Sequence, residues 1–164
     1  ATSLADEAFY DRVKKTTLCR ERRFYIPHGA ILGLDGVFDG REMLTEVDIT
    51  TIKTPKGLGS DMTTRTVLFE GSTRDACKKF PKNVNVHACL AMAGIGFDKT
   101  QSTIVADPDI KGNTHLIKLR GDGVDFEIKI SSIPQGLVTG VYTPWSAFGS
   151  ILRIGERAPG FCIV

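Results

Sequence analysis

The chain has 164 residues, of which 41% are hydrophobic and 24% charged, and its formal net charge is +2 at pH 7. These values are typical of one soluble globular domain, and charges of mixed sign without a basic stripe argue against a nucleic-acid partner. Because no run approaches the roughly 20 apolar residues that cross a bilayer, and residues 1–15 do not resemble a signal peptide, we expect an intracellular, cytoplasmic protein without a membrane partner.

The first half of the chain predicts two helices and two strands. Residues 4–15 carry acidic side chains early and lysines late, which indicates a short surface helix. Residues 22–38 predict an apolar β-like segment up to Pro27 and then a helix beginning near Gly29. Residues 46–58 and 64–71 each predict a strand.

The second half predicts three helices and three strands. A helix over residues 71–80 has Ser72 and Asp75 at capping-box spacing, and a second helix over residues 82–96 ends at Gly94. Strands are predicted within residues 102–108, 115–121 and 125–132, followed by an amphipathic helix over residues 143–155. Because the strands come in groups, the sequence favours an α+β fold, a single domain over residues 1–164 with a mixed β-sheet and helices packed on one face.

The four cysteines are scattered without CxxC spacing, and two of them fall inside apolar or helical patterns. We therefore expect thiols, with neither disulfides nor a metal site. These residues are Cys19, Cys77, Cys89 and Cys162.

The stretch "DPDIKGNTHLIKL", residues 107–119, places Asn113 and His115 at the start of a strand. Since side chains alternate between the faces of a strand, both should share one face with Ile117 and Leu119. A histidine there is either buried with one satisfied hydrogen bond or part of a functional site.

The glycine-rich stretch "GAILGLDG", residues 29–36, does not have the GxGxxG spacing of a dinucleotide-binding turn. No acidic residue ends a second strand about 20 residues further on, as such a site requires. The sequence thus contains no nucleotide-binding or phosphate-binding motif that we recognise.

Several segments together resemble the catalytic, C-terminal domain of the aspartate dehydrogenase family. They are "GAILGLDG", "TTIKTP", "LFEGSTRDACKKFPKNVNVHACLAMAGIGFDKT" and "IVADPDIKGNTHLIKLRG". The resemblance extends in order over about residues 1–130. It implies the fold of that domain, a homodimer or larger assembly joined through the sheet, and an NAD(P)-dependent oxidation of a small amino acid such as L-aspartate to an imine. Family members carry a Rossmann domain ahead of this region, and we expect it to be absent here.

The resemblance also implies site residues. His115 matches the acid/base histidine, with Asn113 beside it. Asn83 and Asn85 lie where a loop enters a helix, where they would bind a substrate carboxylate or cap the helix. Lys53 would pair with a carboxylate or end its strand in solvent.

Gly29 and Ala30 are expected to begin a helix whose N-terminus receives an anionic group near the cofactor. His28 and His87 depart from the family pattern, and with His115 they are the only histidines of the chain. We expect them to add substrate-binding or proton-transfer groups, or else to lie on a loop and a solvated helix face.

Three functions remain open from the sequence. The chain is the catalytic half of an NAD(P)-dependent amino acid dehydrogenase, either as a fragment or together with a separate Rossmann subunit. Alternatively, it is a standalone, cofactor-free enzyme for imine or C–N bond chemistry, such as cyclisation, decarboxylation or epimerisation in a biosynthetic pathway. The third possibility is a binding or assembly module in which His115 has no catalytic function.

Overall fold

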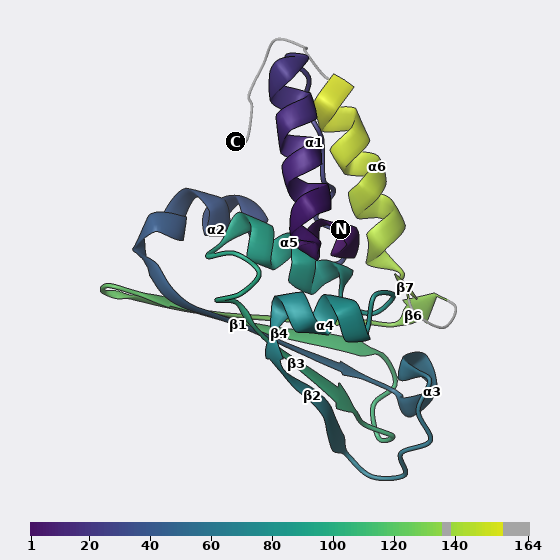
Figure 1. Cartoon of the computed structure of the whole chain (residues 1–164). Helices are drawn as coiled ribbons and strands as arrows, with labels where there is room; N and C mark the ends of the chain where they lie inside the picture. Colours follow the sequence, from purple (N-terminus) through teal and green to yellow (C-terminus); the bar gives the residue numbers. More distant parts are fainter. Residues whose placement is uncertain (136–138, 156–164) are drawn as a thin grey trace.

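A computed structural model describes residues 1–135 and 139–155, which form a five-stranded sheet and the helices packed on it (Figure 1). The strand order is β2-β3-β1-β4-β5, so β1 lies at the centre. The strands are β1 (Leu44–Lys53), β2 (Thr66–Ser72), β3 (Gln101–Ala106), β4 (Asn113–Gly121) and β5 (Val124–Ser132).

The sheet is mixed because β1 pairs with β3 in parallel and with β4 in antiparallel orientation. The β4–β5 hairpin turns at Asp122 and Gly123, and Gly123 has a left-handed φ of 75°. An Asp-Gly pair suits such a tight turn since glycine adopts positive φ without steric cost. A parallel partner instead requires a long crossover, here the segment between β1 and β3, which contains β2 and three helices.

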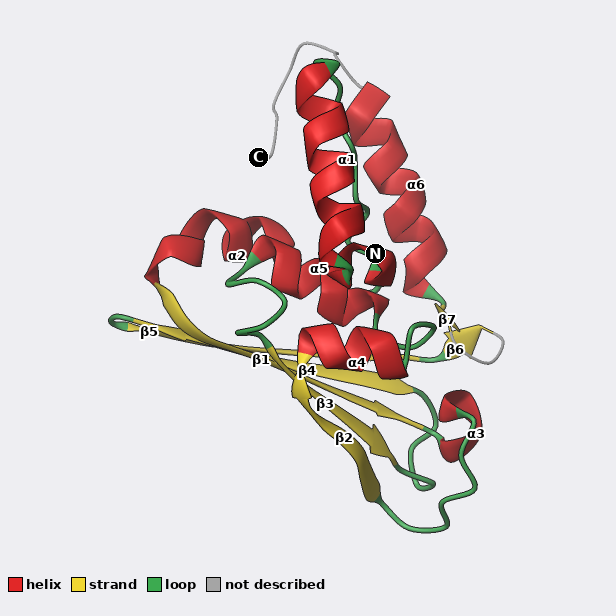
Figure 2. Cartoon of the chain, viewed as in Figure 1, coloured by secondary structure: helices red, strands yellow, loops and turns green. Residues whose placement is uncertain are grey.

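Helices cover one face of the sheet, and the other face carries none in the described ranges (Figure 2). Over the covered face lie α2 (Leu34–Gly40), α4 (Thr73–Lys79) and α5 (Asn85–Ala93). Helices α1 (Glu7–Cys19) and α6 (Tyr142–Gly155) project away from it. The remaining elements are η1 (Thr2–Ala5), η2 (Arg41–Met43), α3 (Pro55–Leu58), β6 (Pro134–Gln135) and β7 (Thr139–Gly140).

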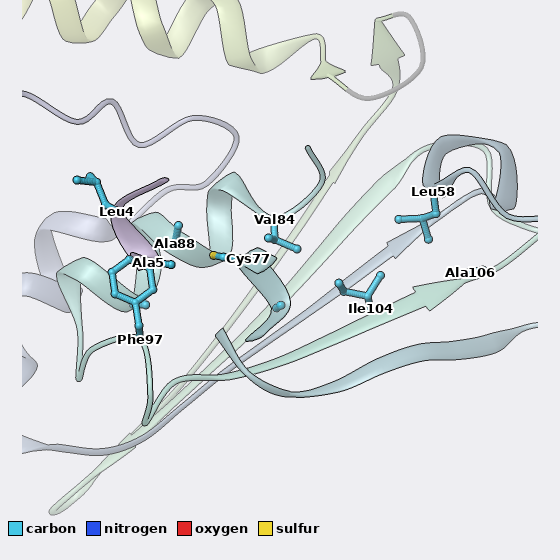
Figure 3. Packing of buried hydrophobic residues seen from close by; sticks show 11 residues of the cluster. Leu4, Ala5, Leu58, Cys77, Val84, Ala88, Phe97, Ile104 and Ala106 are labelled. Carbon is cyan, nitrogen blue, oxygen red and sulfur yellow. The ribbon is translucent and has the colours of Figure 1, made fainter. Parts of the chain in front are cut away.

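The core between the helices and the sheet consists of two apolar clusters. One lies under α4 and the N-terminal 3-10 helix and includes Val84, Phe97 and Ile104 (Figure 3). The other lies nearer α2 and includes Leu90 and Ile117. Helix α5 contributes to both, which explains why nearly all of its side chains are buried.

The expected α+β fold, with a mixed sheet and helices on one face, is confirmed. The predicted cap is also present, because the Ser72 side chain accepts a hydrogen bond from the Asp75 backbone N–H at the start of α4. Helix α1 lies on the surface as expected and has no buried residue.

Two local expectations for residues 22–38 are wrong. Residues 22–28 pair with no described strand, and the helix begins at Leu34 instead of near Gly29. Gly29 and Gly33 have left-handed φ values of 66° and 79°, which a continuous right-handed helix cannot contain. Gly29 and Ala30 therefore form a turn, and the anion-binding helix terminus expected there does not exist.

Cys19, Cys77 and Cys89 are free thiols, whereas Cys162 lies outside the described residues. Burial raises the pKa of both Cys77 and Cys89 to about 11, so these two thiols are not activated. In the part of the chain that the structure describes, no helix has the length and apolar character needed to span a bilayer.

Candidate active site

A pocket of about 130 Å³ opens where several elements end beside one another. It is smaller than the roughly 300–1,000 Å³ pockets that hold drug-sized ligands, so its size suits a small metabolite. Lys53 is the last residue of β1 and Asn113 the first of the antiparallel β4, and this pairing brings the two strand ends together. The lining comprises Gly29, Ala30, Lys53, Lys82, Asn83, Asn85, Val86, Asn113, His115, Ser132, Gly140 and Thr143.

Seven of the nine site residues expected from the sequence thus line one pocket, although they come from separate parts of the chain. They are Gly29, Ala30, Lys53, Asn83, Asn85, Asn113 and His115. His28 and His87 are not among the lining residues.

Lys53 is the buried cation of the pocket, with only 3% of its surface exposed. Its Nζ donates a hydrogen bond to Oδ1 of Asn83 at 3.1 Å. Burial lowers the pKa of Lys53 to about 8, because removing water disfavours the charged ammonium. The lysine is therefore still mainly protonated at neutral pH, and a bound anion would restore stabilisation that the cation has lost on burial.

The two asparagines at the entry to α5 do not cap this helix. The N-cap residue is Val84, which makes no side-chain capping bond. The first turn of an α-helix leaves backbone N–H groups without helical partners, and here that turn begins at Asn85 beside the pocket. Asn83, Asn85 and these N–H groups together offer hydrogen-bond donors to an anion.

The described side chains that line the pocket include Lys53 and Lys82 but no aspartate or glutamate. Two cations, several amides and a helix N-terminus produce a positive potential there. The pocket therefore favours a ligand with one or more carboxylates.

His115 lies on the floor of the pocket and is 4% exposed. Asn113, Ile117 and Leu119 are buried on the same face of β4, as strand alternation predicts. Nδ1 of His115 is 2.8 Å from Oγ1 of Thr51, its register partner on β1. Burial and the charge of Lys53 lower the pKa of His115 to about 4, so the imidazole is neutral at neutral pH.

His87 lies beneath the pocket and is fully buried, so it is not on a solvated helix face. It is not a lining residue either, and a ligand in the pocket would not contact it. Its Nε2 is 2.6 Å from the same Thr51 hydroxyl that contacts His115. Burial, with smaller contributions from His115 and Lys53, lowers the pKa of His87 to about 3.

His28 lies apart from the pocket, in a neighbouring hollow between residues 23–28 and α6. Its Nδ1 donates to the backbone carbonyl of Ile31 at 2.9 Å, and Arg153 donates to its Nε2 at 3.1 Å. Both ring nitrogens thus have protein partners.

The sequence interpretation missed Thr51, the residue that joins the two buried histidines. Strand alternation contains a signal for it, because Val47, Ile49, Thr51 and Lys53 occupy alternate positions of β1 and are all buried. A threonine in such a row must place its hydroxyl inside the protein, where it needs a partner. Lys82, adjacent to Asn83, was also missed.

Comparison with known proteins identifies the family. The model described as the C-terminal domain of aspartate dehydrogenase matches residues 37–154. The chain belongs to the aspartate dehydrogenase family.

L-aspartate dehydrogenase of Methanopyrus kandleri is 37% identical to this family member over 153 residues, which cover 92% of this chain and 58% of the relative. L-aspartate dehydrogenase of Thermotoga maritima is 39% identical over 134 residues, covering 82% of this chain and 55% of the relative. The chain thus spans little more than half the length of these relatives.

The fold agrees with the crystal structure of aspartate dehydrogenase from Thermotoga maritima. The two superpose with a TM-score of 0.81 at 32% sequence identity, covering 98% of this chain and 65% of the other. This agreement supports the sheet order that brings the pocket residues together.

Proposed function

We propose that residues 1–164 form the substrate-binding and acid/base half of an NAD(P)-dependent L-aspartate dehydrogenase. The observation that carries the proposal is a neutral, buried histidine on the floor of a pocket lined by two lysines and no carboxylate among the described lining side chains. L-aspartate has two carboxylates, which suit the lysines, and an amine, from which a neutral histidine can take a proton. The names of the relatives support this substrate.

The substrate carboxylates are held by charge and by amide donors. Lys53 binds one carboxylate, oriented by its hydrogen bond to Asn83. Asn85 and the N–H groups at the start of α5 hold the same group or the second one. Binding a dianion here stabilises the charged form of Lys53, and the nearby negative charge also raises the low pKa of His115.

His115 then handles protons at the reacting centre. The chemistry that bound NAD(P) would supply is acceptance of the hydride from Cα of the substrate. The amine must lose a proton for the imine to form, and His115 takes it through Nε2, the ring nitrogen that does not contact Thr51. It releases this proton to solvent before the same nitrogen accepts a proton from the water that adds to the imine, and it returns that second proton to the leaving ammonia.

The rim of the pocket at Gly29 and Ala30 suits the reacting end of the cofactor. Gly29 has no side chain, so a flat ring can approach its backbone closely at this rim. Because the sequence has no GxGxxG turn, we propose that the phosphates are bound by a Rossmann domain outside these residues or by a separate subunit. Dimerisation through the sheet remains a prediction.

The cofactor-free alternative gained from the expected loss of the Rossmann domain and from three histidines within the motifs of one site. Only His115 lines the pocket, since His87 lies beneath it and His28 in the neighbouring hollow. The placement of the histidines therefore does not favour this alternative.

The test is ammonia release from L-aspartate by the natural protein that carries this chain, with and without NAD(P). The proposal expects release only with the nucleotide, together with an equal amount of NAD(P)H. Ammonia or decarboxylation without nucleotide would establish the cofactor-free alternative instead. Binding of L-aspartate without turnover under either condition would indicate a binding module.

A further inference from the structure

A row of five hydrogen-bonded side chains leads from the pocket floor into the interior, and we call it the polar row. Each member comes from a different element, and all are buried. In order, the members are His115, Thr51, His87, Ser102 and Thr73, with separations of 2.8 Å (Nδ1 to Oγ1), 2.6 Å (Oγ1 to Nε2), 2.8 Å (Nδ1 to Oγ) and 2.7 Å (Oγ to Oγ1).

The inner end of the polar row has a fixed direction. The Thr73 hydroxyl lies 3.1 Å from the backbone carbonyl of Thr100, which can only accept, so Thr73 donates there. A hydroxyl has one proton, and Thr73 must therefore accept from Ser102. Ser102 in turn has used its proton and must accept from Nδ1 of His87.

This direction passes through His87 to the pocket. Because the pKa of His87 is about 3, the ring carries a single proton, which lies on Nδ1, and Nε2 accepts from the Thr51 hydroxyl. Thr51 then accepts from Nδ1 of His115. A neutral His115 with its proton on Nδ1 has an unprotonated Nε2, the form that a general base requires.

The opposite direction makes one hydrogen bond fewer. If Thr73 turned its proton to Ser102, every later bond would reverse and His115 would carry its proton on Nε2. That arrangement has four bonds within the polar row, whereas the first has the same four and the additional bond from Thr73 to the Thr100 carbonyl. A buried hydrogen bond that is left unmade carries a free-energy cost, so the first direction is favoured.

We propose that His87 is a positioning residue which, through Thr51, holds His115 in the tautomer with the proton on Nδ1 and the lone pair of Nε2 available to a ligand. The catalytic meaning of this arrangement rests on the proposed acid/base function of His115, but the tautomer itself can be measured without turnover. When Nε2 takes a proton from the substrate, the Thr51 oxygen already accepts from Nδ1–H and stabilises the imidazolium.

The direct test is the ¹⁵N NMR spectrum of the chain with ring-labelled histidine near neutral pH, since protonated and unprotonated ring nitrogens have well-separated shifts. With only three histidines, the His28→Gln and His115→Ala variants together complete the assignment. We expect both His115 and His87 to be protonated on Nδ1. A wild-type His115 protonated on Nε2 would overturn the inference without any variant.

The decisive variant is Ser102→Ala, because it does not touch His115. It removes the acceptor for Nδ1–H of His87, and a buried N–H without a partner is less tolerable than a bare acceptor. His87 should then move its proton to Nε2 and donate to Thr51, which forces the Thr51 proton toward His115. We expect the ratio of the two His115 tautomers to change at least tenfold toward the Nε2–H form; an unchanged ratio would refute the proposal.

Further variants control for damage to the fold. Thr51→Val should also remove the preference of His115 for the tautomer with its proton on Nδ1. It is the deciding variant if Ser102→Ala does not fold. Thr51→Ser keeps the hydroxyl and should retain the wild-type tautomer. Thr50→Val is the matched control, since Thr50 is the adjacent residue of β1 and belongs to the opposite face of the strand.

Turnover separates this inference from the proposed function. Once the substrate is established, Ser102→Ala should lower kcat in proportion to the fraction of His115 that still has its proton on Nδ1, with KM little changed, as expected when only the reactive form of a base is depleted. If His115→Ala retains full turnover while the tautomer responds as described, the proposed function fails and the polar row stands. If His115→Ala is inactive but Ser102→Ala leaves the tautomer of His115 unchanged, the positioning role of His87 is refuted and the proposed function is not.

Discussion

The covered face of the sheet has two kinds of interior. The two clusters around Ile104 and Ile117 are apolar, and their burial stabilises the fold through the hydrophobic effect, which does not depend on the orientation of the groups. The polar row is equally buried, but each of its bonds depends on which partner supplies the proton. The net contribution of one intramolecular hydrogen bond to the free energy of unfolding is only about 1 kcal/mol, so the polar row adds little stability for the number of groups that it orders. Its benefit lies in defining the state of one imidazole.

Helix α5 shows how closely the two interiors meet. Ala88 packs in one apolar cluster and Leu90 in the other, while His87 joins the polar row. Changes in the apolar clusters should therefore alter folding, and changes in the polar row should alter chemistry. The predictions below test this separation.

The largest effect is expected for His115→Ala, which should lower turnover by about 10² to 10⁴, as removal of a positioned acid/base group does. The variant also leaves Thr51 without one partner, so we expect a loss of about 1–3 kcal/mol in unfolding free energy. Turnover and urea unfolding measured on the same sample separate the two effects. Turnover that falls only in proportion to the unfolded fraction would assign His115 to the fold.

Leu119→Ala should show the opposite pattern. Leu119 lies on the same face of β4 as His115 and is buried in an apolar cluster. Truncating such a side chain removes about 2–5 kcal/mol of stability. Because Leu119 does not line the pocket, turnover per folded molecule should be unchanged. The pair His115→Ala and Leu119→Ala is thus matched by strand and face. A loss of kcat in folded Leu119→Ala would show that the two interiors are not separable.

Much of this arrangement could be predicted from the sequence. Alternation along residues 113–119 places Asn113 and His115 on the buried face, and the Ser72 cap marks the start of α4. These features depend on local periods and local hydrogen bonds, which a sequence shows directly.

The polar row could not be predicted, because it depends on which strands are neighbours. Thr51 meets both histidines only because β1 lies between β3 and β4 and passes under α5. The burial of His87 was equally hidden, since α5 is apolar around most of its circumference and its sequence does not distinguish a solvent face. The turn at Gly29 was missed for a different reason, since glycine suits both a left-handed turn and a helix end.

Acid should weaken the fold through the two buried histidines. Burial lowers their pKa values from 6.5 to about 4 for His115 and about 3 for His87, so below pH 6.5 the unfolded chain binds protons that the folded chain does not. Their stabilising contribution is complete above pH 6.5 and is lost as the pH falls. Well below pH 6.5 each histidine costs about 1.4 kcal/mol per pH unit, and because the unfolded imidazoles are only half protonated at pH 6.5 itself, the two together cost roughly 2 kcal/mol between pH 6.5 and about 5.5.

Urea unfolding at a series of pH values measures this loss. In His115→Ala the slope over the same interval should fall by about half, because one of the two histidines is missing. A stability that stays constant from pH 6.5 to about 5.5 would mean that the two imidazoles are protonated in the folded protein.

The smallest effect concerns the pocket cation. Lys53→Met removes the buried charge but keeps a side chain of similar length, so the fold should persist while affinity for a dicarboxylate falls. A charged hydrogen bond contributes about 1.5–3 kcal/mol, which corresponds to a roughly 10- to 100-fold weaker Kd for succinate as a probe. Lys56→Met is the matched control, because Lys56 is exposed on α3 and does not line the pocket.

The pH dependence of succinate binding sharpens the assignment. Burial lowers the pKa of Lys53 to about 8, so the free protein loses this cation as the pH rises through 8, well before an ordinary lysine would. Calorimetric affinity should therefore decline above pH 8 in the wild type and in Lys56→Met, and should be flat over that range in Lys53→Met. The same decline in Lys53→Met would assign the anion to another cation, with Lys82 the remaining lysine among the described lining residues.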